Sequence, residues 1–253
     1  MTYDRDGIRL ILANALAVLP TLPAESVSCV VTSPPFWSLR RYDAPPSIWG
    51  GGVDCEHEWK DSLAGQSAST CLHCNAWRGH FGGEPLADCL AWARGELLCN
   101  ACYLCHTRAF LQAIRRVLRP DGVVWWDSDD SRAGSRKGTT KAGVVSGGAL
   151  QRRNRGSIGL GWTDWGEVSI LAKNLCLIPQ RIALAAQADG WTVRSEIVIS
   201  TWMPESARDR PTDATRKILL LAKSNKPTFY WNERTMVHAD RPPAQRAEGT
   251  DWD

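Results

Sequence analysis

The sequence predicts an α/β protein built on a mainly parallel sheet. Two short apolar runs, residues 27–31 and 123–126, have the composition of buried strands, and each runs directly into polar residues. Between them, residues 108–118 place apolar side chains at helical spacing. A strand, a helix and a strand in this order favour a parallel pair joined by a crossover helix. Because ligands bind beyond the carboxyl ends of such strands, the residues that follow each run are the first candidates for a functional site.

The remaining elements follow from local signals. Residues 7–12 are strand-like and residues 13–22 form a short helix or turn, so we expect the parallel sheet to begin here, with a strand, a helix and the strand at 27–31. A helix begins near Pro179 and stops at Gly190. The other predicted elements are a turn at 119–122, a strand at 191–199, and strands at 217–222 and 228–231 near an antiparallel edge of the sheet.

Composition sets the broad class of protein. The 253 residues suit one large domain, or one domain with an insertion. The 30 basic and 27 acidic residues nearly balance, so net charge alone does not indicate a nucleic-acid-binding protein. No apolar run approaches the ~18 residues that a membrane helix needs, and the N-terminus carries no signal-peptide pattern. We therefore expect a cytoplasmic protein with no membrane partner, in which C-x-x-C spacing indicates metal binding rather than disulfides.

The first predicted strand ends at an unusual loop, Thr32-Ser33-Pro34-Pro35-Phe36. Two consecutive prolines fix the backbone φ angle and supply no N–H, so the loop is stiff and its carbonyls are free to accept hydrogen bonds. Such a loop suits a site that binds a donor group. Pro-Pro also ends strands in ordinary loops, and the tetrapeptide alone leaves that alternative open.

The surrounding sequence resembles the amino-group DNA methyltransferases, whose catalytic loop reads Ser/Asp/Asn-Pro-Pro-Tyr/Phe. The resemblance extends over segments 10–15, 22–27, 32–42, 178–183, 188–191, 203–206 and 209–212, with the catalytic motif ahead of the cofactor motif. It implies a class I, Rossmann-like methyltransferase fold, double-stranded DNA as the partner and S-adenosylmethionine as the methyl donor. In this family Asp130, after the second strand, matches a residue near the target base or the cofactor, although it could equally cap the next segment.

The chemistry of the resemblance assigns roles to the loop. An exocyclic amine on a base is a poor nucleophile, and acceptors at Ser33 Oγ and the Pro34 carbonyl would turn its lone pair toward the methyl donor. Phe36 would stack on a base flipped out of the duplex, for about 1 to 3 kcal/mol. We expect Pro35 to complete the catalytic loop. Trp37 and Arg40 are expected to contact DNA, and Asn14 and Thr32 to lie near the cofactor. No Pro-Cys dipeptide occurs, which disfavours methylation at cytosine C5.

Residues 49–106 form a cysteine-rich insertion. Cys55 and His57 are followed by Cys71 and Cys74, a set that fits a closed tetrahedral zinc site; scattered buried thiols are the alternative. A second group follows in the same insertion. Its members are Cys99, Cys102 and Cys105, with Cys89 or His106 as the fourth ligand. We expect zinc there rather than an iron–sulfur cluster, with free thiols as the alternative.

A basic, glycine-rich loop spans residues 132–163. No acidic residue lies between Ser131 and Thr163, so the sequence predicts a flexible cationic loop that contacts phosphates; a solvated linker is the alternative. The basic residues expected to bind DNA are Arg136, Lys137, Arg152, Arg153 and Arg155.

The sequence thus divides into a catalytic part at 1–48 and 107–240, the insertion at 49–106, and a polar tail at 241–253. The Phe-x-Gly-x-Gly cofactor motif of the family is absent from the 253 residues. Three interpretations remain: a truncated enzyme, a split enzyme completed by a second chain, or a zinc-containing DNA-binding or decoy protein without activity. Ser33 slightly favours cytosine N4 over adenine N6 as the target. Methylation of a protein glutamine amide or of RNA uses similar loop chemistry and also stays open.

Overall fold

A computed structural model of the chain describes residues 2–37, 46–60, 69–84, 102–133, 170–171, 173–201, 210–211 and 213–225. The predicted strand at 228–231 and the tail at 241–253 lie outside the described residues, as does almost all of the basic loop at 132–163.

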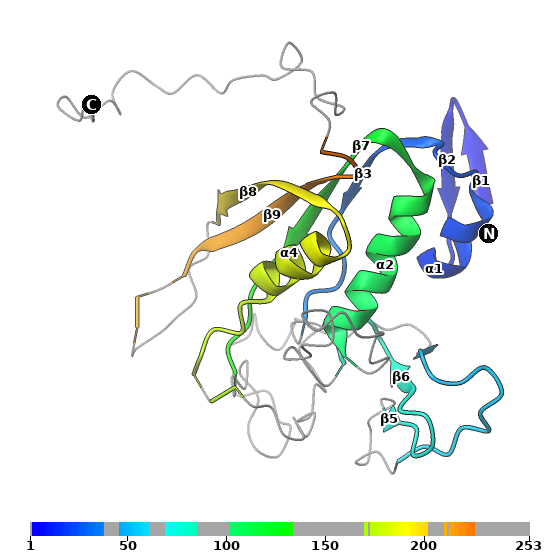
Figure 1. The fold of residues 1–253 in the computed structure, drawn as a ribbon, viewed down its shortest axis with the longest axis vertical. Helices are drawn as coiled ribbons and strands as arrows, with labels where there is room; N and C mark the ends of the chain where they lie inside the picture. The colour runs from blue at the N-terminus through cyan, green and yellow to red at the C-terminus, as the bar shows by residue number, and fades with distance from the viewer. Residues whose placement is uncertain are drawn as a thin grey trace, which may run out of the picture.

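A four-stranded mixed sheet forms the centre of the protein (Figure 1). Its order is β3 (Val27–Thr32), β7 (Leu118–Ser128), β9 (Thr215–Ala222) and β8 (Thr192–Ser200). β3 and β7 are parallel, whereas β9 runs antiparallel to both β7 and β8. The prediction of an α/β protein with a parallel pair and an antiparallel side is confirmed, with β8 rather than β9 at the edge.

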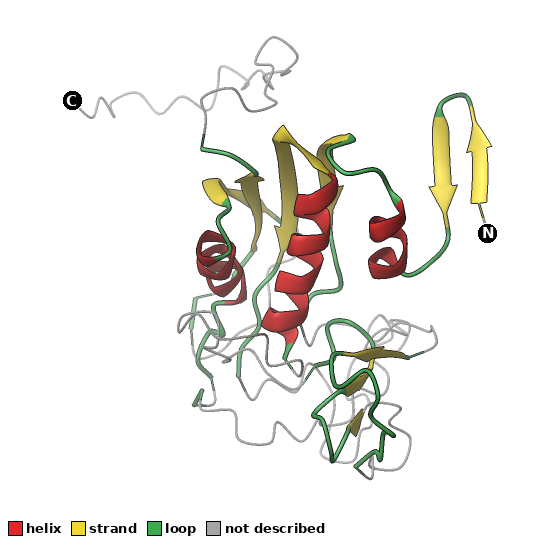
Figure 2. Ribbon diagram, turned by 45° about the vertical axis from the view of Figure 1, so that its right-hand side comes forward, coloured by secondary structure: helices red, strands yellow, loops and turns green. Residues whose placement is uncertain are grey.

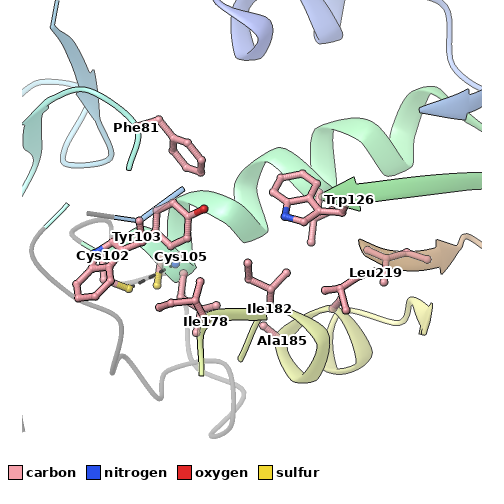
Figure 3. Packing of buried hydrophobic residues seen from close by; sticks show 14 of the residues in the cluster. Phe81, Cys102, Tyr103, Cys105, Trp126, Ile178, Ile182, Ala185 and Leu219 are labelled. Atoms are coloured by element: carbon pink, nitrogen blue, oxygen red, sulfur yellow. Dashed lines mark hydrogen bonds between the residues drawn. The ribbon is translucent and has the colours of Figure 1, made fainter. Parts of the chain in front are cut away.

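Helices α2 (Tyr103–Val117) and α4 (Ile178–Ala188) lie side by side over one face of this sheet (Figure 1). The core between the layers contains Trp126 of β7 and Leu219 of β9, which face apolar side chains of α4 (Figure 3). An ion pair joins the two helices, because Arg108 Nε donates to Asp189 Oδ2 at 2.8 Å while the second guanidinium nitrogen contacts Oδ1. Both side chains are about nine-tenths buried, so this pair links the helices within the core.

The helix α2 begins earlier than the sequence predicts. Its first residue is Tyr103, five positions before the predicted start, and Cys102 serves as its N-cap. The Cys102 Sγ accepts a hydrogen bond from the Cys105 N–H at 3.4 Å. A cysteine is not a recognised capping residue, which explains why capping patterns missed this start. At the other helix the predictions are confirmed, since Pro179 lies in the first turn of α4 and Gly190 follows its end.

The predicted strand, short helix and strand at the start of the chain are all present, but the expectation that the first strand joins the parallel sheet is wrong. Strand β2 (Ile8–Ile11) pairs with β1 (Thr2–Arg5) in an antiparallel hairpin around Asp6 and Gly7. This hairpin is a separate two-stranded sheet, as Figure 2 shows, and the short helices α1 (Ala15–Val18) and η1 (Leu19–Thr21) follow it. An Asp-Gly turn gives β2 a local partner only three residues away, which needs no crossover connection.

The turn predicted at residues 119–122, ahead of a strand that starts at residue 123, is instead a bulge within the longer strand β7. Val27 pairs with Leu118 but Cys29 pairs with Val123, so the register shifts between these two positions of β3. Arg119 and Asp121 form an ion pair of 3.0 Å across this bulge. The turn residues are therefore accommodated within the strand.

A second, smaller sheet lies mostly within the predicted insertion, although its first strand begins at Ser47. β4 (Ser47–Trp49), β6 (Trp77–Gly79) and β5 (Ser69–Thr70) pair antiparallel in the order β4-β6-β5. Figures 1 and 2 place this sheet beyond the N-terminal end of α2. Among the described residues, no helix has both the length and the apolar character that crossing a bilayer requires.

Candidate active site and metal centre

The parallel pairing of β3 and β7 brings the two predicted strand ends together. Thr32, the last residue of β3, pairs with Trp126, so the loop that starts at Ser33 and the polar residues after Trp126 leave the sheet at the same edge. The loops are also directly connected. The Ser131 hydroxyl donates to the Trp37 carbonyl at 2.9 Å in a buried position.

The hydrogen-bond acceptors of the Ser-Pro-Pro-Phe loop differ in whether they have a donor. The Pro35 carbonyl accepts a hydrogen bond of 3.1 Å from the Tyr103 hydroxyl. Ser33 is exposed, and none of the described residues donates a hydrogen bond to its hydroxyl or to the Pro34 carbonyl. The ring of Phe36 is half-buried. The two acceptors expected to bind an amine are thus the ones that the described part of the chain does not use.

Trp37 does not lie where a DNA-contacting residue would. Its side chain is 2% exposed, and its indole Nε1–H donates to the Glu84 carbonyl at 3.0 Å. The ring is therefore a core side chain and offers no stacking face, which differs from the sequence prediction. Burial satisfies both its apolar ring and its N–H, as tryptophan requires.

Asp130 performs the capping role that the sequence left open. Its Oδ1 accepts hydrogen bonds from the N–H groups of Ser131 at 2.7 Å and Ile178 at 3.1 Å, and Ile178 is the first residue of α4. Burial raises the pKa of Asp130, against the opposing effect of these N–H groups. The Oδ2 atom is buried without a hydrogen-bond partner among the described residues. Asp130 thus holds the start of α4 at the edge of the sheet where the Ser-Pro-Pro-Phe loop lies.

The two residues expected near the cofactor lie in different places. Thr32 ends β3 and is half-buried directly before the loop. Asn14 is exposed and caps α1, where its Oδ1 accepts the Leu16 N–H at 2.9 Å. Arg40 and the five basic residues of the predicted DNA-binding loop are outside the described residues.

Four predicted metal ligands come together in the insertion. The ligand atoms of Cys55, His57, Cys71 and Cys74 all lie within 4.8 Å of one another. Cys55 Sγ and Cys71 Sγ are 3.9 Å apart, and Cys74 Sγ and His57 Nδ1 are 3.4 Å apart. A tetrahedral zinc ion with bonds of ~2.3 Å to sulfur and ~2.0 Å to nitrogen separates its ligands by roughly 3.5 to 3.8 Å. The donor set and its spacing therefore fit zinc.

The local backbone explains how these ligands meet. The Cys71 N–H donates to the Ala76 carbonyl at 2.7 Å, which folds the segment into a tight turn that carries Cys74. Gly51 lies against this turn with φ of +88°, and a Cβ there would be 2.8 Å from Cys74 Sγ. Glycine is required at position 51 because any side chain would displace a ligand and strain the backbone.

The pKa values of two thiols in this group, Cys55 and Cys71, are shifted in opposite directions. A hydrogen bond with Cys74, burial and the interaction with Cys71 raise the pKa of Cys55 to about 12. Burial raises the pKa of Cys71, but N–H groups of Cys74 and His73 and the side chains of His57 and Cys74 outweigh it and lower the value to about 6. The sulfurs thus crowd around a shared point, where a dication would favour the thiolate form of each.

The second predicted metal group is only partly described. Cys102 and Cys105 are buried at the start of α2, where Figure 3 shows them in the core beside Tyr103. Cys89 and Cys99 lie outside the described residues. The second site accordingly stays a prediction.

Sequence reasoning missed two residues near the Ser-Pro-Pro-Phe loop, Tyr103 and Glu84, and considered a third, His106, only as a possible metal ligand. Tyr103 binds the Pro35 carbonyl, and Glu84 and His106 form a buried pair in which His106 Nδ1 lies 3.0 Å from Glu84 Oε1. Burial raises the pKa of Glu84, opposed by the hydrogen bond and charge of His106. A single glutamate and a histidine 22 residues apart carry no spacing that would have identified them.

The fold and the site together define an α/β protein whose acceptor loop lies at the carboxyl ends of two parallel strands, beside a candidate zinc module. A family model described as a DNA methylase, of the N6/N4 methyltransferase type, matches residues 27–251. The chain belongs to this DNA methylase family.

Curated relatives agree with the family assignment. The chain is 28% identical over 230 residues to the Type II methyltransferase M.Cfr9I of Citrobacter freundii, which covers 90% of the chain and 58% of that protein. It is 27% identical over 247 residues to the Type II methyltransferase M.SmaI of Serratia marcescens, with coverage of 96% and 65%. The chain therefore spans about three fifths of the length of these relatives.

Among solved structures, the chain is similar to PvuII DNA methyltransferase, which is named as cytosine-N4-specific. The TM-score is 0.39 with 12% sequence identity, over 84% of this chain and 48% of that one.

Proposed function

We propose that the chain carries the catalytic loop of an S-adenosylmethionine-dependent DNA methyltransferase that modifies an exocyclic amine of a flipped base. The observation that carries the proposal is the state of the Ser-Pro-Pro-Phe loop. Ser33 is exposed at the sheet edge, and the Pro35 carbonyl is engaged by Tyr103. Family membership supplies the class of reaction, and the names of the Type II relatives support a role in restriction–modification.

The loop would act on the amine by accepting its two hydrogens. Ser33 Oγ and the Pro34 carbonyl are the acceptors, and the stiff Pro-Pro backbone keeps them at a fixed separation. When both N–H groups are held, the nitrogen lone pair leaves conjugation with the ring and is available for attack on a methyl group. The half-buried ring of Phe36 offers a stacking face for the flipped base.

S-adenosylmethionine would supply an electrophilic methyl group. The described residues contain no glycine-rich turn after a parallel strand, so they form at most part of its site. Thr32, at the end of β3, and Asn14 are the residues we propose near it. Neither residue is given a chemical role in the transfer of the methyl group.

Cytosine N4 is the target that we favour over adenine N6, because serine precedes the two prolines. Double-stranded DNA is the proposed substrate, and zinc in the Cys55–His57–Cys71–Cys74 group is the proposed metal. The basic residues between 132 and 163 would contact phosphates.

The test is methyl transfer to duplex DNA. The purified chain is incubated with labelled S-adenosylmethionine and DNA from a methylation-deficient host, in parallel with Ser33→Ala. We expect at most weak labelling by the wild-type chain alone, and a further loss of roughly 10²- to 10³-fold in kcat for Ser33→Ala, because an acceptor aimed at the reacting amine is removed. DNA affinity should be unchanged. Equal labelling by both proteins would remove the proposed role of the loop.

A chain that binds DNA in a salt-sensitive way but shows no labelling and no binding of S-adenosylmethionine by calorimetry would support the alternative function. That alternative is a zinc-containing DNA-binding or decoy protein. Adding a longer relative's cofactor-binding part separates it from a split enzyme, because only the split enzyme would gain activity.

A further inference from the structure

Glu84, at the end of the described insertion, joins three separate parts of the chain. Its Oε2 accepts the Gly82 N–H at 2.6 Å, its Oε1 lies 3.0 Å from His106 Nδ1 on α2, and its backbone carbonyl accepts the Trp37 indole N–H at 3.0 Å. The side chain is completely buried. We call this set of contacts the Glu84 junction.

The junction is enclosed by aromatic rings. His106 stacks on Trp49 of β4 with ring centroids 4.8 Å apart, and Phe81 packs on Tyr103 at 4.9 Å. Figure 3 shows Phe81 facing Tyr103 at the start of α2. A buried carboxylate is costly unless it is fully hydrogen-bonded, so these contacts hold Glu84 in one position.

The junction touches the catalytic loop at its backbone. Gly82 has φ of +92°, and a Cβ there would lie 3.0 Å from the Phe36 carbonyl and 3.2 Å from the Pro35 carbonyl. The Tyr103 hydroxyl also binds the Pro35 carbonyl, at 3.1 Å. The loop backbone that follows the two proposed amine acceptors is therefore packed against the turn that Glu84 orders.

We propose that Glu84 is a positioning residue for methyl transfer: with His106 it orders the Gly82 turn and Trp37, and through them fixes the aim of Ser33 Oγ and the Pro34 carbonyl. The effect of Glu84 on catalysis rests on the proposed function. The effect of Glu84 on the order of the loop does not rest on that function, because it is inferred from the contacts alone. The insertion thus has a role at the active site beyond any contact with DNA.

The expected effect follows from the sensitivity of positional catalysis. Acceptors that belong to a backbone move whenever that backbone moves, and a displacement of about 1 Å costs on the order of 10²-fold in rate. Glu84→Gln keeps the shape of the side chain but removes its charge and replaces one acceptor oxygen with a donor, so Gly82 and His106 can both keep a partner only if the His106 ring changes tautomer.

The experiment compares Glu84→Gln with Asp189→Asn in the full chain. Asp189 is a matched control, because it also belongs to a buried ion pair of α2, with Arg108, but contacts no residue of the catalytic loop in the described part of the chain. Amide hydrogen exchange of the peptide containing Phe36 and Trp37 is measured for both variants and the wild type, with circular dichroism as the check of folding.

We expect Glu84→Gln to speed exchange at Phe36 and Trp37 at least tenfold, and Asp189→Asn to leave it within about twofold once overall stability is matched with urea. In methyl transfer, kcat of Glu84→Gln should fall roughly tenfold to a hundredfold, with KM for DNA within about twofold. Glu84→Asp, which keeps the carboxylate, should lose less activity than Glu84→Gln.

Unchanged loop exchange in a folded Glu84→Gln protein would overturn the proposal, and so would faster exchange with an unaltered kcat. If the wild-type chain transfers no methyl group, the proposed function fails, and exchange alone decides whether Glu84 orders the loop. Should Glu84→Gln not fold, His106→Leu, which has no polar group to bind Glu84 but leaves Glu84 in place, is measured in the same way with the same expected outcome.

Discussion

At the scale of single residues, the neighbouring side chains of Phe36 and Trp37 have opposite environments. Phe36 is half-buried at the sheet edge while Trp37, one position later, is 2% exposed in the core. The resemblance implied that both rings face the DNA, with Phe36 stacking on the flipped base and Trp37 contacting the duplex. The difference arises from Glu84 and Ser131, which bind the indole N–H and the carbonyl of Trp37 from distant segments.

Asp130 gives a prediction about pH and stability. Burial holds its pKa in the folded protein above the value of 3.8 for an unperturbed aspartate, so the folded state binds the proton more tightly than the unfolded chain. The stabilising contribution is complete below the unfolded pKa and is lost as the pH rises through the folded pKa. Asp130→Asn does not titrate and keeps an oxygen for Ile178 and Ser131.

We therefore expect the free energy of unfolding of Asp130→Asn, relative to the wild type, to increase as the pH is raised from about 4 toward neutrality. Urea denaturation at several pH values measures this difference, and metal loss at low pH affects both proteins equally. A difference that does not change with pH would show that the carboxyl is not destabilised by its burial.

At the scale of elements, strand pairing was predictable where local signals coincide with burial. The strands at 27–31 and 123–126 are short apolar runs, and the structure pairs them in parallel as expected. The segment 7–12 carries the same kind of signal, but its apolar side chains are exposed in a hairpin, with Ile8 and Leu10 both 60% accessible. The hydrophobic pattern of a strand does not show whether it pairs with a neighbouring strand in a hairpin or joins the central sheet.

The candidate zinc module was the most predictable part of the site, because ligand type and spacing are both encoded locally. Its prediction is that Cys71→Ser lowers the zinc content by one equivalent per chain, measured by mass spectrometry of metals after gel filtration. We expect Tm to fall as well, by about 2–4 °C for each kcal/mol of stability that the metal supplies.

The control for this prediction is Cys29→Ser. Cys29 is a half-buried thiol on β3 that is not among the four grouped ligands, so its substitution should leave the zinc content unchanged. Equal zinc in Cys71→Ser and the wild type would contradict the proposed site, and loss of two equivalents would show that both predicted groups depend on it.

At the scale of the whole molecule, the position of the Ser-Pro-Pro-Phe loop at the end of β3 was predictable, whereas the residues that pack against it were not. Ser33 through Phe36 stand together in the sequence, whereas Tyr103, His106 and Glu84 reach the loop from positions 47 to 68 residues away or through one another. Such contacts depend on how the insertion packs against α2, and no residue pattern specifies that packing.

The proposed DNA binding would also depend on the whole protein, and the sequence predicts its salt dependence. If Arg152, Arg153 and Arg155 contact phosphates, replacing all three with alanine should reduce the slope of log K against log salt concentration by about 0.9 for each phosphate that is no longer neutralised. Fluorescence anisotropy of a labelled duplex at several salt concentrations measures the slope.

A matched triple substitution is Arg5→Ala, Arg9→Ala and Arg119→Ala, which removes the same charge from exposed positions in the described part of the chain. An equal change of slope in both proteins would mean that only net charge matters. A smaller change in the loop variant than in the control would favour the solvated-linker interpretation.

The Glu84 junction has a consequence for how the chain reaches its native state. Cys29 pairs with Val123, so the central parallel pair forms only after a connection of 94 residues (123 minus 29) has closed. The contact of Trp37 with Glu84, 47 residues apart, lies inside that connection and, once made, removes half of its length. Halving a loop lowers the entropic cost of closing it by about 0.6 kcal/mol. If the contacts of the insertion close before the sheet forms, they would speed the pairing of β3 with β7.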